Sequence, residues 1–316
     1  MKDTKNIAIV FPGQGSQRPG MGKDFYEQIP ICRETYEEAA DALGWDVSKM
    51  CFGEDERLNL TEYTQPCIVT TEIAMLRGLS KRYGFMSEYF GGHSLGEFTA
   101  LVAAGVMPLS ETLQIVQTRG KLMQDAVPVG VGGMAAIISE NIDIDILNKL
   151  MEDLPADVAN INSANQVVIS GELSALPEIE KRLPQTLGAE KTFRFIRLNV
   201  SAPFHSRLMK SIENRFADTL EKFGKNLEPQ NAHKVTSNFT GGFHSDDILG
   251  IREKLVYQIS NTVQWRKNML SLAAMTEEIY EIGPGRPLRD FFKTIGVTCQ
   301  SITGLAAAEK IFSGSN

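Results

Sequence analysis

The chain has 316 residues and a formal net charge of −7, with 42% hydrophobic and 22% charged residues. This composition is typical of a globular protein with one large domain or two medium ones. The negative charge and the lack of Lys/Arg runs argue against a nucleic-acid-binding surface. No apolar run approaches the roughly 20 residues of a membrane span. The four cysteines are scattered without a C-x-x-C pair, which argues against a metal site or disulfide framework and favours a cytoplasmic location.

The first apolar segment, Ile7–Phe11, is continuous and rich in β-branched residues. It predicts a strand buried on both faces, as in a parallel sheet. The loop at residues 12–17, Pro-Gly-Gln-Gly-Ser-Gln, follows directly. Open α/β sheets place ligand sites at the carboxyl ends of their strands, although a plain turn explains the same residues. A Walker A phosphate loop is excluded because the Gly-Lys-Ser/Thr ending is missing.

Helical spacing of apolar residues follows over residues 22–44, with Gly44 as a plausible C-terminal cap. Residues 50–61 have the composition of a loop with short helical pieces. A second helix is expected from residues 64–66, with Pro66 near its first turn, to about Leu79.

The sequence Gly-His-Ser-Leu-Gly at residues 92–96 has the Gly-x-Ser-x-Gly pattern of a nucleophile elbow. A short strand candidate precedes it at residues 87–90, and a helix of small and apolar residues follows at 97–104, with Glu97 in its first turn. A glycine-rich turn with a solvated serine explains the pattern alone. The flanking strand and helix favour Ser94 as a nucleophile.

The next helix begins near Pro108 and carries Arg119 between Ile115 and Met123, four residues away on either side. An arginine in an apolar row is seldom left unpaired. It can extend its charged end to solvent, form a buried ion pair, or bind an anionic ligand.

A Pro- and Gly-rich stretch at residues 127–133 indicates a boundary. The segments that follow have the order strand (134–139), helix (144–154), strand (158–161), strand (167–170), helix (176–187) and strand (192–200). This βαββαβ order predicts a ferredoxin-like small subdomain at residues 130–200, inserted into a larger one formed by 1–129 and 201–316.

The C-terminal part returns to a mixed pattern. Helices are expected at residues 207–223, 248–259 and 264–274, strands at 234–238 and 278–282, and a frayed end after residue 306.

A serine needs a base, usually histidine, and the chain has four histidines. His93 adjoins Ser94, and adjacent side chains on a sharp turn point apart, so a structural or substrate-facing role is expected. His233 and His244 lie in polar segments and are expected to be solvated. His205 lies at a strand-to-helix transition and is the preferred base.

No Asp or Glu stands out as a third member of a triad, and a carbonyl oxygen can orient the imidazole instead. The N–H of Leu95 is the expected first donor of an oxyanion hole. A second donor can come from the loop at residues 12–17, if its strand lies beside the elbow strand.

With these features placed, the chain resembles malonyl-CoA:acyl-carrier-protein transacylases and the related acyltransferases of polyketide synthesis. Seven motifs carry this resemblance in the family's order: Phe-Pro-Gly-Gln-Gly-Ser-Gln (11–17), Gly-His-Ser-Leu-Gly-Glu (92–97), Gln-Thr-Arg-Gly (117–120), Gly-Met-Ala-Ala (133–136), Pro-Phe-His-Ser (203–206), Asn-Thr-Val-Gln-Trp (261–265) and Glu-Ile-Gly-Pro-Gly (281–285).

The resemblance implies an α/β-hydrolase-like large subdomain with a parallel sheet and a ferredoxin-like insertion. It also implies that Ser94 attacks the thioester of malonyl-CoA to form a malonyl ester, and that His205 removes the serine proton and later activates the pantetheine thiol of an acyl carrier protein. Malonyl-CoA is then a substrate, and no metal or redox cofactor, nucleic acid or membrane is implied.

The remaining site residues also follow from the resemblance. The N–H groups of Gln14 and Leu95 would form the oxyanion hole, and Arg119 would hold the malonyl carboxylate through two hydrogen bonds. The carbonyl of Gln258 would orient the histidine, and Phe204 would exclude an α-methyl group.

The resemblance fits fatty-acid or polyketide synthesis. The form Ala-Pro-Phe-His-Ser at residues 202–206, with Gly-Gly-Met at 132–134, is more similar to free-standing acyltransferases that serve polyketide synthases in trans. Two alternatives compete with acyl transfer: a hydrolase that clears acyl groups from carrier proteins, and a catalytically silent docking module. A hydrolase gains nothing from a carboxylate clamp, so Arg119 argues against it, and the intact Ser94 and His205 argue against a silent module.

Overall fold

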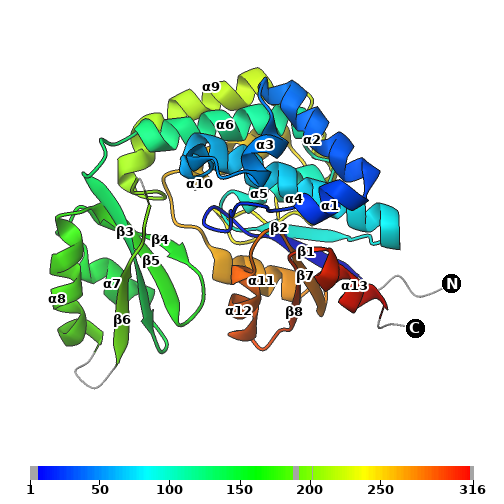
Figure 1. Cartoon of the computed structure of the whole chain (residues 1–316). Helices are drawn as coiled ribbons and strands as arrows, with labels where there is room; N and C mark the ends of the chain where they lie inside the picture. Colours follow the sequence, from blue (N-terminus) through cyan, green and yellow to red (C-terminus); the bar gives the residue numbers. More distant parts are fainter. Residues whose placement is uncertain (1–5, 188–191, 201, 314–316) are drawn as a thin grey trace.

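A computed structural model describes residues 6–187, 192–200 and 202–313, which contain two separate four-stranded sheets (Figure 1). The first sheet has the order β2-β1-β7-β8, and all of its paired strands are parallel. Its strands are β1 (Ile7–Phe11), β2 (Tyr89–Gly92), β7 (Glu278–Ile282) and β8 (Cys299–Ile302).

Strand β1 lies in the middle of this sheet and is buried on both faces. Ile9 and Phe11 enter one apolar core, while Ala8 and Val10 enter a second core on the opposite face. Because both faces of β1 are buried, its residues are apolar at successive positions rather than at every second one.

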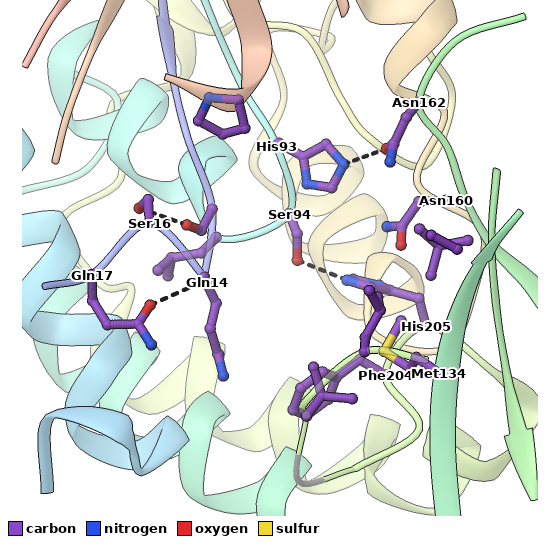
Figure 2. A pocket seen from close by; sticks show the side chains of 18 of the residues that line it. Gln14, Ser16, Gln17, His93, Ser94, Met134, Asn160, Asn162, Phe204 and His205 are labelled. Carbon is purple, nitrogen blue, oxygen red and sulfur yellow. Dashed lines mark hydrogen bonds between the residues drawn. The ribbon is translucent and has the colours of Figure 1, made fainter. Parts of the chain in front are cut away.

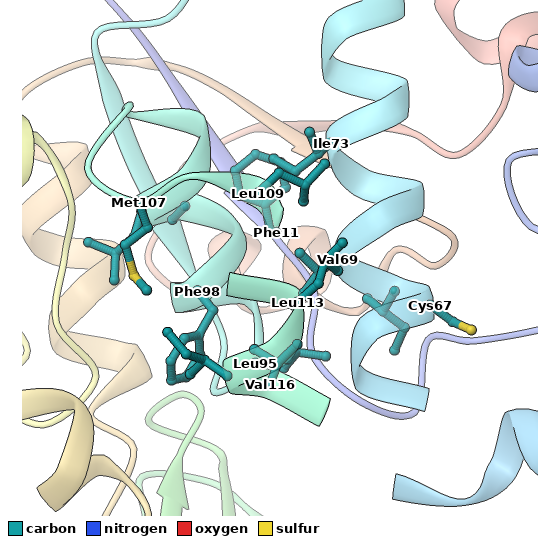
Figure 3. Close-up of a cluster of buried hydrophobic side chains, with 14 of the residues drawn as sticks. Phe11, Cys67, Val69, Ile73, Leu95, Phe98, Met107, Leu109, Leu113 and Val116 are labelled. Carbon is teal, nitrogen blue, oxygen red and sulfur yellow. The ribbon is translucent and has the colours of Figure 1, made fainter. Parts of the chain in front are cut away.

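Helices cover both faces of the parallel sheet (Figure 1). One face packs against α4 (Thr61–Tyr83), α5 (Gly96–Ala103) and α6 (Leu109–Asp125), and the other against α11 (Trp265–Ala273) and α12 (Pro287–Lys293). Figure 3 shows the first core, where Phe98 of α5 and Val69 of α4 surround Phe11 and Leu95. The rigid layer beneath the elbow is therefore built from β1 and three helices.

Helix α13 (Leu305–Ser313) packs against β8. The other helices of the large part lie outside these layers: α1 (Lys23–Gln28), α2 (Pro30–Leu43), α3 (Val47–Phe52), η1 (Glu56–Asn59), η2 (Arg207–Ile212), α9 (Glu213–Phe223), η3 (Pro229–Lys234) and α10 (Ile248–Gln258). Among the described helices, none is both long and apolar enough to cross a membrane.

The second sheet has the order β4-β5-β3-β6, and all of its pairs are antiparallel. With α7 (Ile144–Leu150) and α8 (Ala175–Leu187), its strands β3 (Gly132–Ser139), β4 (Ala156–Ile161), β5 (Gln166–Glu172) and β6 (Phe193–Arg197) follow the chain order βαββαβ. The predicted fold class, a parallel sheet with a separate ferredoxin-like unit, is confirmed. The exact subdomain limits, 1–129 with 201–316 and 130–200, stay a prediction.

Helices α7 and α8 cover only one face of the second sheet (Figure 1). Ala135 and Ile137 of β3 enter the core beneath these helices, whereas Met134 and Ala136 alternate with them and join the core of the large part. The face without helices therefore forms a wall toward the parallel sheet.

Main-chain contacts join the two sheets. The N–H of Val263 donates to the carbonyl of Ala159, and the N–H of Ile161 donates to the carbonyl of Val263. Arg207 adds a 2.6 Å ion pair with Asp157 of β4. Strand β4 is thus tied directly to the segment that precedes α11.

Several predicted elements were wrong. Residues 234–238 form only isolated bridges at Val235 and Thr236, because the chain turns back at residues 237–242. Residues 22–44 form two helices, since Pro30 begins the second. The edge strand β8 was missed because it is short and half-buried, and the expected frayed end is α13, whose Phe312 stacks on Tyr83.

Candidate active site

Ser94 stands on a sharp turn between β2 and α5. Its φ angle of 52° lies in the left-handed region, which is rare for a residue with a Cβ. A Cβ on Gly92 would lie 2.0 Å from the carbonyl carbon of Gly96, and a Cβ on Gly96 would lie 2.1 Å from the carbonyl oxygen of Phe11. Both glycines are therefore required by close backbone contacts, and the turn holds the serine hydroxyl above the sheet.

His205 lies against Ser94, although 111 positions separate them. Its Nε2 is 2.7 Å from the Ser94 Oγ, and its Nδ1 is 2.7 Å from the main-chain carbonyl oxygen of Gln258, at the end of α10 (Figure 2). A carbonyl only accepts, so Nδ1 carries the proton and the lone pair of Nε2 faces the serine hydroxyl.

The imidazole of His205 is 4% exposed. Burial, with the nearby positive charge of Arg119 as the second cause, lowers the pKa of His205 to about 3, and the Gln258 carbonyl opposes this shift. The ring is therefore neutral at physiological pH, which is the state that can accept a proton.

Arg119 of α6 is 1% exposed, and its guanidinium points toward Ser94. One terminal nitrogen donates to the Gln65 side chain at 3.0 Å, and the other donates to the Gln258 side chain at 2.8 Å and to the Ser94 Oγ at 3.2 Å. Burial lowers the pKa of Arg119 to about 10, and the charge of Glu97 opposes this effect. The guanidinium remains positively charged at neutral pH.

A cavity of about 740 Å³ opens in front of this group. The parallel sheet contributes the loop after β1 and the elbow, and the antiparallel sheet contributes Met134 and Asn160. Figure 2 shows these side chains facing Ser94 from the opposite wall, with Phe204 beside His205. Within the described part of the chain, no three His, Cys, Asp or Glu side chains are grouped so as to hold a metal ion.

Both proposed oxyanion donors, Gln14 and Leu95, line this cavity. Phe11 of β1 pairs with Gly92 of β2, so the loop that follows β1 lies against the elbow. Among the described residues, the N–H groups of Gln14 and Leu95 donate to no protein atom. Strand β1 therefore lies beside the elbow strand β2, which is the condition under which the loop after β1 can supply a second donor.

The remaining histidines have distinct surroundings. His93 lines the cavity and donates from Nε2 to the side-chain oxygen of Asn162 at 2.8 Å, which matches a structural or substrate-facing position. His233 is exposed, as expected. The expectation that His244 is solvated was wrong: it is 3% exposed and bonds to Glu97, because the chain after residue 237 folds back under the elbow.

Several cavity residues were missed by sequence reasoning. Gln65 is a buried residue of α4, and Asn160 and Asn162 stand two residues apart, at the end of β4 and directly after it. Two amides at alternate positions share one face of a strand, so this pair was a usable signal. Nothing local in the sequence distinguishes Gln65.

The acyl transferase domain model matches residues 8–281, a range that contains Ser94, Arg119 and His205. The malonyl CoA-acyl carrier protein transacylase of Salmonella typhimurium is 39% identical over 296 residues, covering 92% of both chains. That of Escherichia coli K12 is 38% identical over 294 residues, again with 92% of both chains.

Solved structures agree. The malonyl CoA-acyl carrier protein transacylase of Clostridium perfringens superposes with a TM-score of 0.90 at 34% identity, over 98% of this chain and 96% of that one. A malonyl-transacylase in complex with a type II PKS acyl-carrier protein has a TM-score of 0.87 at 31% identity, over 98% and 100% of the two chains. The chain therefore belongs to the acyl transferase domain family and, within it, to the malonyl CoA-acyl carrier protein transacylases. This confirms the resemblance drawn from the motifs.

Proposed function

We propose that the protein transfers a malonyl group from malonyl-CoA to the phosphopantetheine thiol of an acyl carrier protein, through an ester on Ser94. One observation carries this proposal: Arg119 is a buried cation whose hydrogen-bond partners are all neutral. A buried charge is costly unless it is paired. A malonyl carboxylate, two bonds from the reacting carbonyl, is a suitable partner beside the Ser94 Oγ.

In the first half-reaction, the Ser94 Oγ attacks the thioester carbon as its proton moves to the Nε2 of His205. The carbonyl oxygen becomes negative and is held by the N–H groups of Gln14 and Leu95. The carbon–sulfur bond then breaks, and the CoA thiolate takes the proton from His205. Malonyl-Ser94 and free CoA result.

In the second half-reaction, the carrier thiol gives its proton to His205 and attacks the ester carbon. The bond from carbon to the Ser94 Oγ breaks, and the oxygen recovers the proton. The Gln258 carbonyl holds the imidazole in one tautomer in both directions. The carbonyl fixes the tautomer as a triad carboxylate would, but without adding a negative charge beside the ring.

Substrate binding should also change the base. The positive charge of Arg119 is the second-largest cause of the low pKa of His205. A bound malonyl carboxylate offsets that charge, so the pKa of His205 rises when the correct substrate is present. The base is then stronger with malonyl than with a neutral acyl group.

The relatives support the choice of partners, because they are named for malonyl CoA and an acyl carrier protein. Phe204 at the cavity and the relative solved with a PKS carrier protein support a further proposal, a free-standing acyltransferase that serves a polyketide synthase in trans. The acidic composition and unpaired cysteines support a cytoplasmic location.

Intact-protein mass spectrometry after incubation with malonyl-CoA tests the proposal. We expect a malonyl adduct on wild-type protein, none on Ser94→Ala, and release of the adduct to a holo-carrier protein. Release to water instead would favour the hydrolase, and no adduct on wild-type protein would exclude both. Presenting fatty-acid and polyketide carrier proteins side by side tests the pathway: faster transfer to the fatty-acid carrier would overturn the polyketide assignment.

A further inference from the structure

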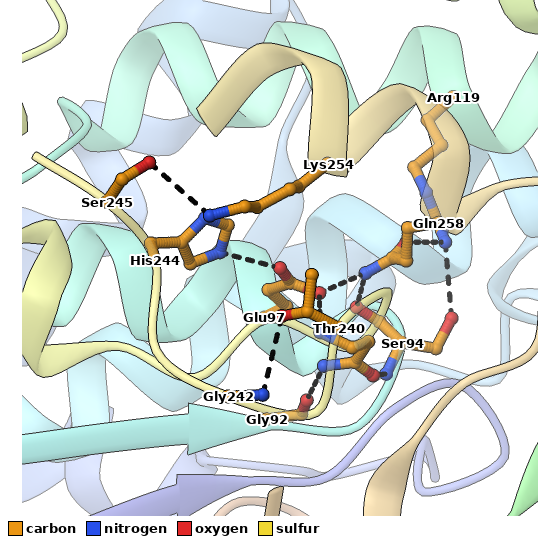
Figure 4. A network of polar contacts seen from close by, with 11 residues as sticks. Gly92, Ser94, Glu97, Arg119, Thr240, Gly242, His244, Ser245, Lys254 and Gln258 are labelled. Carbon is orange, nitrogen blue, oxygen red and sulfur yellow. Dashed lines mark hydrogen bonds and ion pairs between the residues drawn. The ribbon is translucent and has the colours of Figure 1, made fainter. Parts of the chain in front are cut away.

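Glu97 is a fully buried carboxylate three residues after Ser94, in the first turn of α5. Its Oε2 accepts from the main-chain N–H of Asn238 at 3.0 Å and from the Gln258 side chain at 2.7 Å, and its Oε1 accepts from the Nε2 of His244 at 2.8 Å (Figure 4). None of these contacts enters the cavity. All of these hydrogen bonds therefore reach the carboxylate from the side of the elbow that faces away from the cavity. The dipole of α5 favours a carboxylate in its first turn, but it does not account for these particular hydrogen bonds.

The Gln258 side chain connects this carboxylate to the site. Its Nε2 donates to Glu97 and to the carbonyl oxygen of Ser94 at 2.9 Å, and its Oε1 accepts from Arg119. A carboxylate only accepts and a guanidinium only donates. Glu97 and the Ser94 carbonyl both accept from the amide nitrogen, and together they keep the amide oxygen of Gln258 facing Arg119.

His244 holds Glu97 from the other side. Its side chain is fully buried, and its main-chain N–H donates to the carbonyl of Val235, which holds this part of the chain beneath the elbow. His244 thus keeps one carboxylate oxygen occupied, and the other oxygen is left for Gln258 and Asn238.

We propose that Glu97, held by His244, is a positioning residue: through the Gln258 side chain it fixes the Arg119 guanidinium beside Ser94 and so sets the preference for malonyl over neutral acyl groups. This inference rests on the proposed function. In this proposal Gln258 has two separate roles: its main-chain carbonyl orients His205, and its side chain orients Arg119.

The test compares the loading of Ser94 from malonyl-CoA and from acetyl-CoA. In Glu97→Gln, one acceptor oxygen becomes an NH2 donor, so the side chain can no longer accept from both His244 and Gln258, and its hold on the Gln258 amide is weakened. We expect kcat/KM for malonyl loading to fall roughly tenfold to a hundredfold, the range for hydrogen bonds to a charged group, while acetyl loading falls by less than about threefold. Equal losses for both donors would overturn the proposal.

A matched control is Glu72→Gln, which makes the same replacement at another fully buried glutamate, one that bonds to Thr99 and not to Gln258. Its malonyl-to-acetyl ratio should stay within about twofold of wild type. A shift as large as that of Glu97→Gln would mean that any buried carboxylate has the same effect, and would overturn the proposal.

A double-mutant cycle tests the route. Gln258→Met keeps the main-chain carbonyl and removes the amide. If Glu97 acts through that amide, adding Glu97→Gln to Gln258→Met leaves the malonyl-to-acetyl ratio unchanged, whereas an additive loss would overturn the proposal.

If thermal unfolding shows that Glu97→Gln does not fold, a pair at His244 replaces it. His244→Gln keeps a donor for Glu97 and should retain the wild-type ratio, while His244→Leu should lower it. Equal ratios in the two variants would contradict the proposal. A wild-type protein that gains no malonyl adduct on Ser94 would refute the proposed function itself, independently of every Glu97 variant.

Discussion

The two sheets contribute to the cavity in different ways. The parallel sheet presents backbone: the tight turn at Ser94, the loop after β1, and N–H groups at the carboxyl ends of β1 and β2. The antiparallel sheet presents side chains from the face of β3, β4 and β5 that its own helices leave uncovered, among them Met134, Asn160 and Val168.

This difference has a physical basis. Backbone donors on a sheet buried on both faces cannot move, which suits the stabilisation of a developing charge. Side chains on the uncovered face of the second sheet can be substituted without disturbing the turn at Ser94. These side chains are therefore suited to discriminate between acyl groups. Changes at the elbow should therefore affect all substrates, and changes on the opposite wall should affect some.

The largest expected effect comes from Arg119→Ala. Removing the guanidinium should lower kcat/KM for malonyl transfer roughly a hundredfold to a thousandfold, because two charge-assisted hydrogen bonds to the carboxylate are lost. Acetyl transfer should fall much less. Arg119→Lys keeps the charge without the planar guanidinium, so its kcat/KM for malonyl transfer should lie between those of the wild type and Arg119→Ala. The same loss for both donors would contradict the carboxylate clamp.

The next effect concerns pH. In the proposed mechanism a neutral His205 is the base, so a lowered pKa of His205 moves the acid limb of kcat/KM to lower pH. With an ordinary histidine pKa of about 6.5, activity at pH 5.5 would be roughly a tenth of its plateau. With the pKa of His205 at about 3, we expect little loss at that pH. An acid limb centred near pH 6.5 in the free enzyme would contradict the buried, neutral base.

A comparable effect is expected from Phe204, which lines the cavity beside His205. Phe204→Ser should relax the exclusion of methylmalonyl-CoA by about tenfold, the range associated with one methyl group in a pocket. Competition between malonyl- and methylmalonyl-CoA measures it, and Phe204→Leu, which keeps most of the bulk, should change it less. Unchanged discrimination would place the selection on other wall residues.

The smallest effect is expected at Asn162, which accepts the hydrogen bond from His93 across the cavity. Asn162→Ala should lower kcat/KM about fivefold, the equivalent of about 1 kcal/mol for one lost hydrogen bond. Asn165→Ala removes an amide from the same loop that bonds to Asn141 instead, and should leave activity unchanged. A loss at Asn165 as large as at Asn162 would indicate a general effect of the loop.

Local patterns predicted much of the fold. Ile7–Phe11 was recognisable because a strand buried on both faces is apolar at every position. The order of strands and helices between residues 130 and 200 predicted the second sheet. The strand at 234–238 failed because β-propensity does not reveal whether a partner strand continues beside it, and here the chain turns after two bridges.

The sequence by itself indicated the nucleophile elbow, since a serine flanked by glycines between a strand and a helix is a local pattern, although the contact that requires Gly96 comes from Phe11 of β1. It also indicated that Arg119 faces the interior, from helical spacing. Tertiary structure alone decided what surrounds them: the contacts Ser94–His205, Arg119–Gln258 and Glu97–His244 join residues 111, 139 and 147 positions apart. Such contacts depend on how separate elements pack and not on the chemistry of any one segment, which is why His244 was expected in solvent and lies in the core.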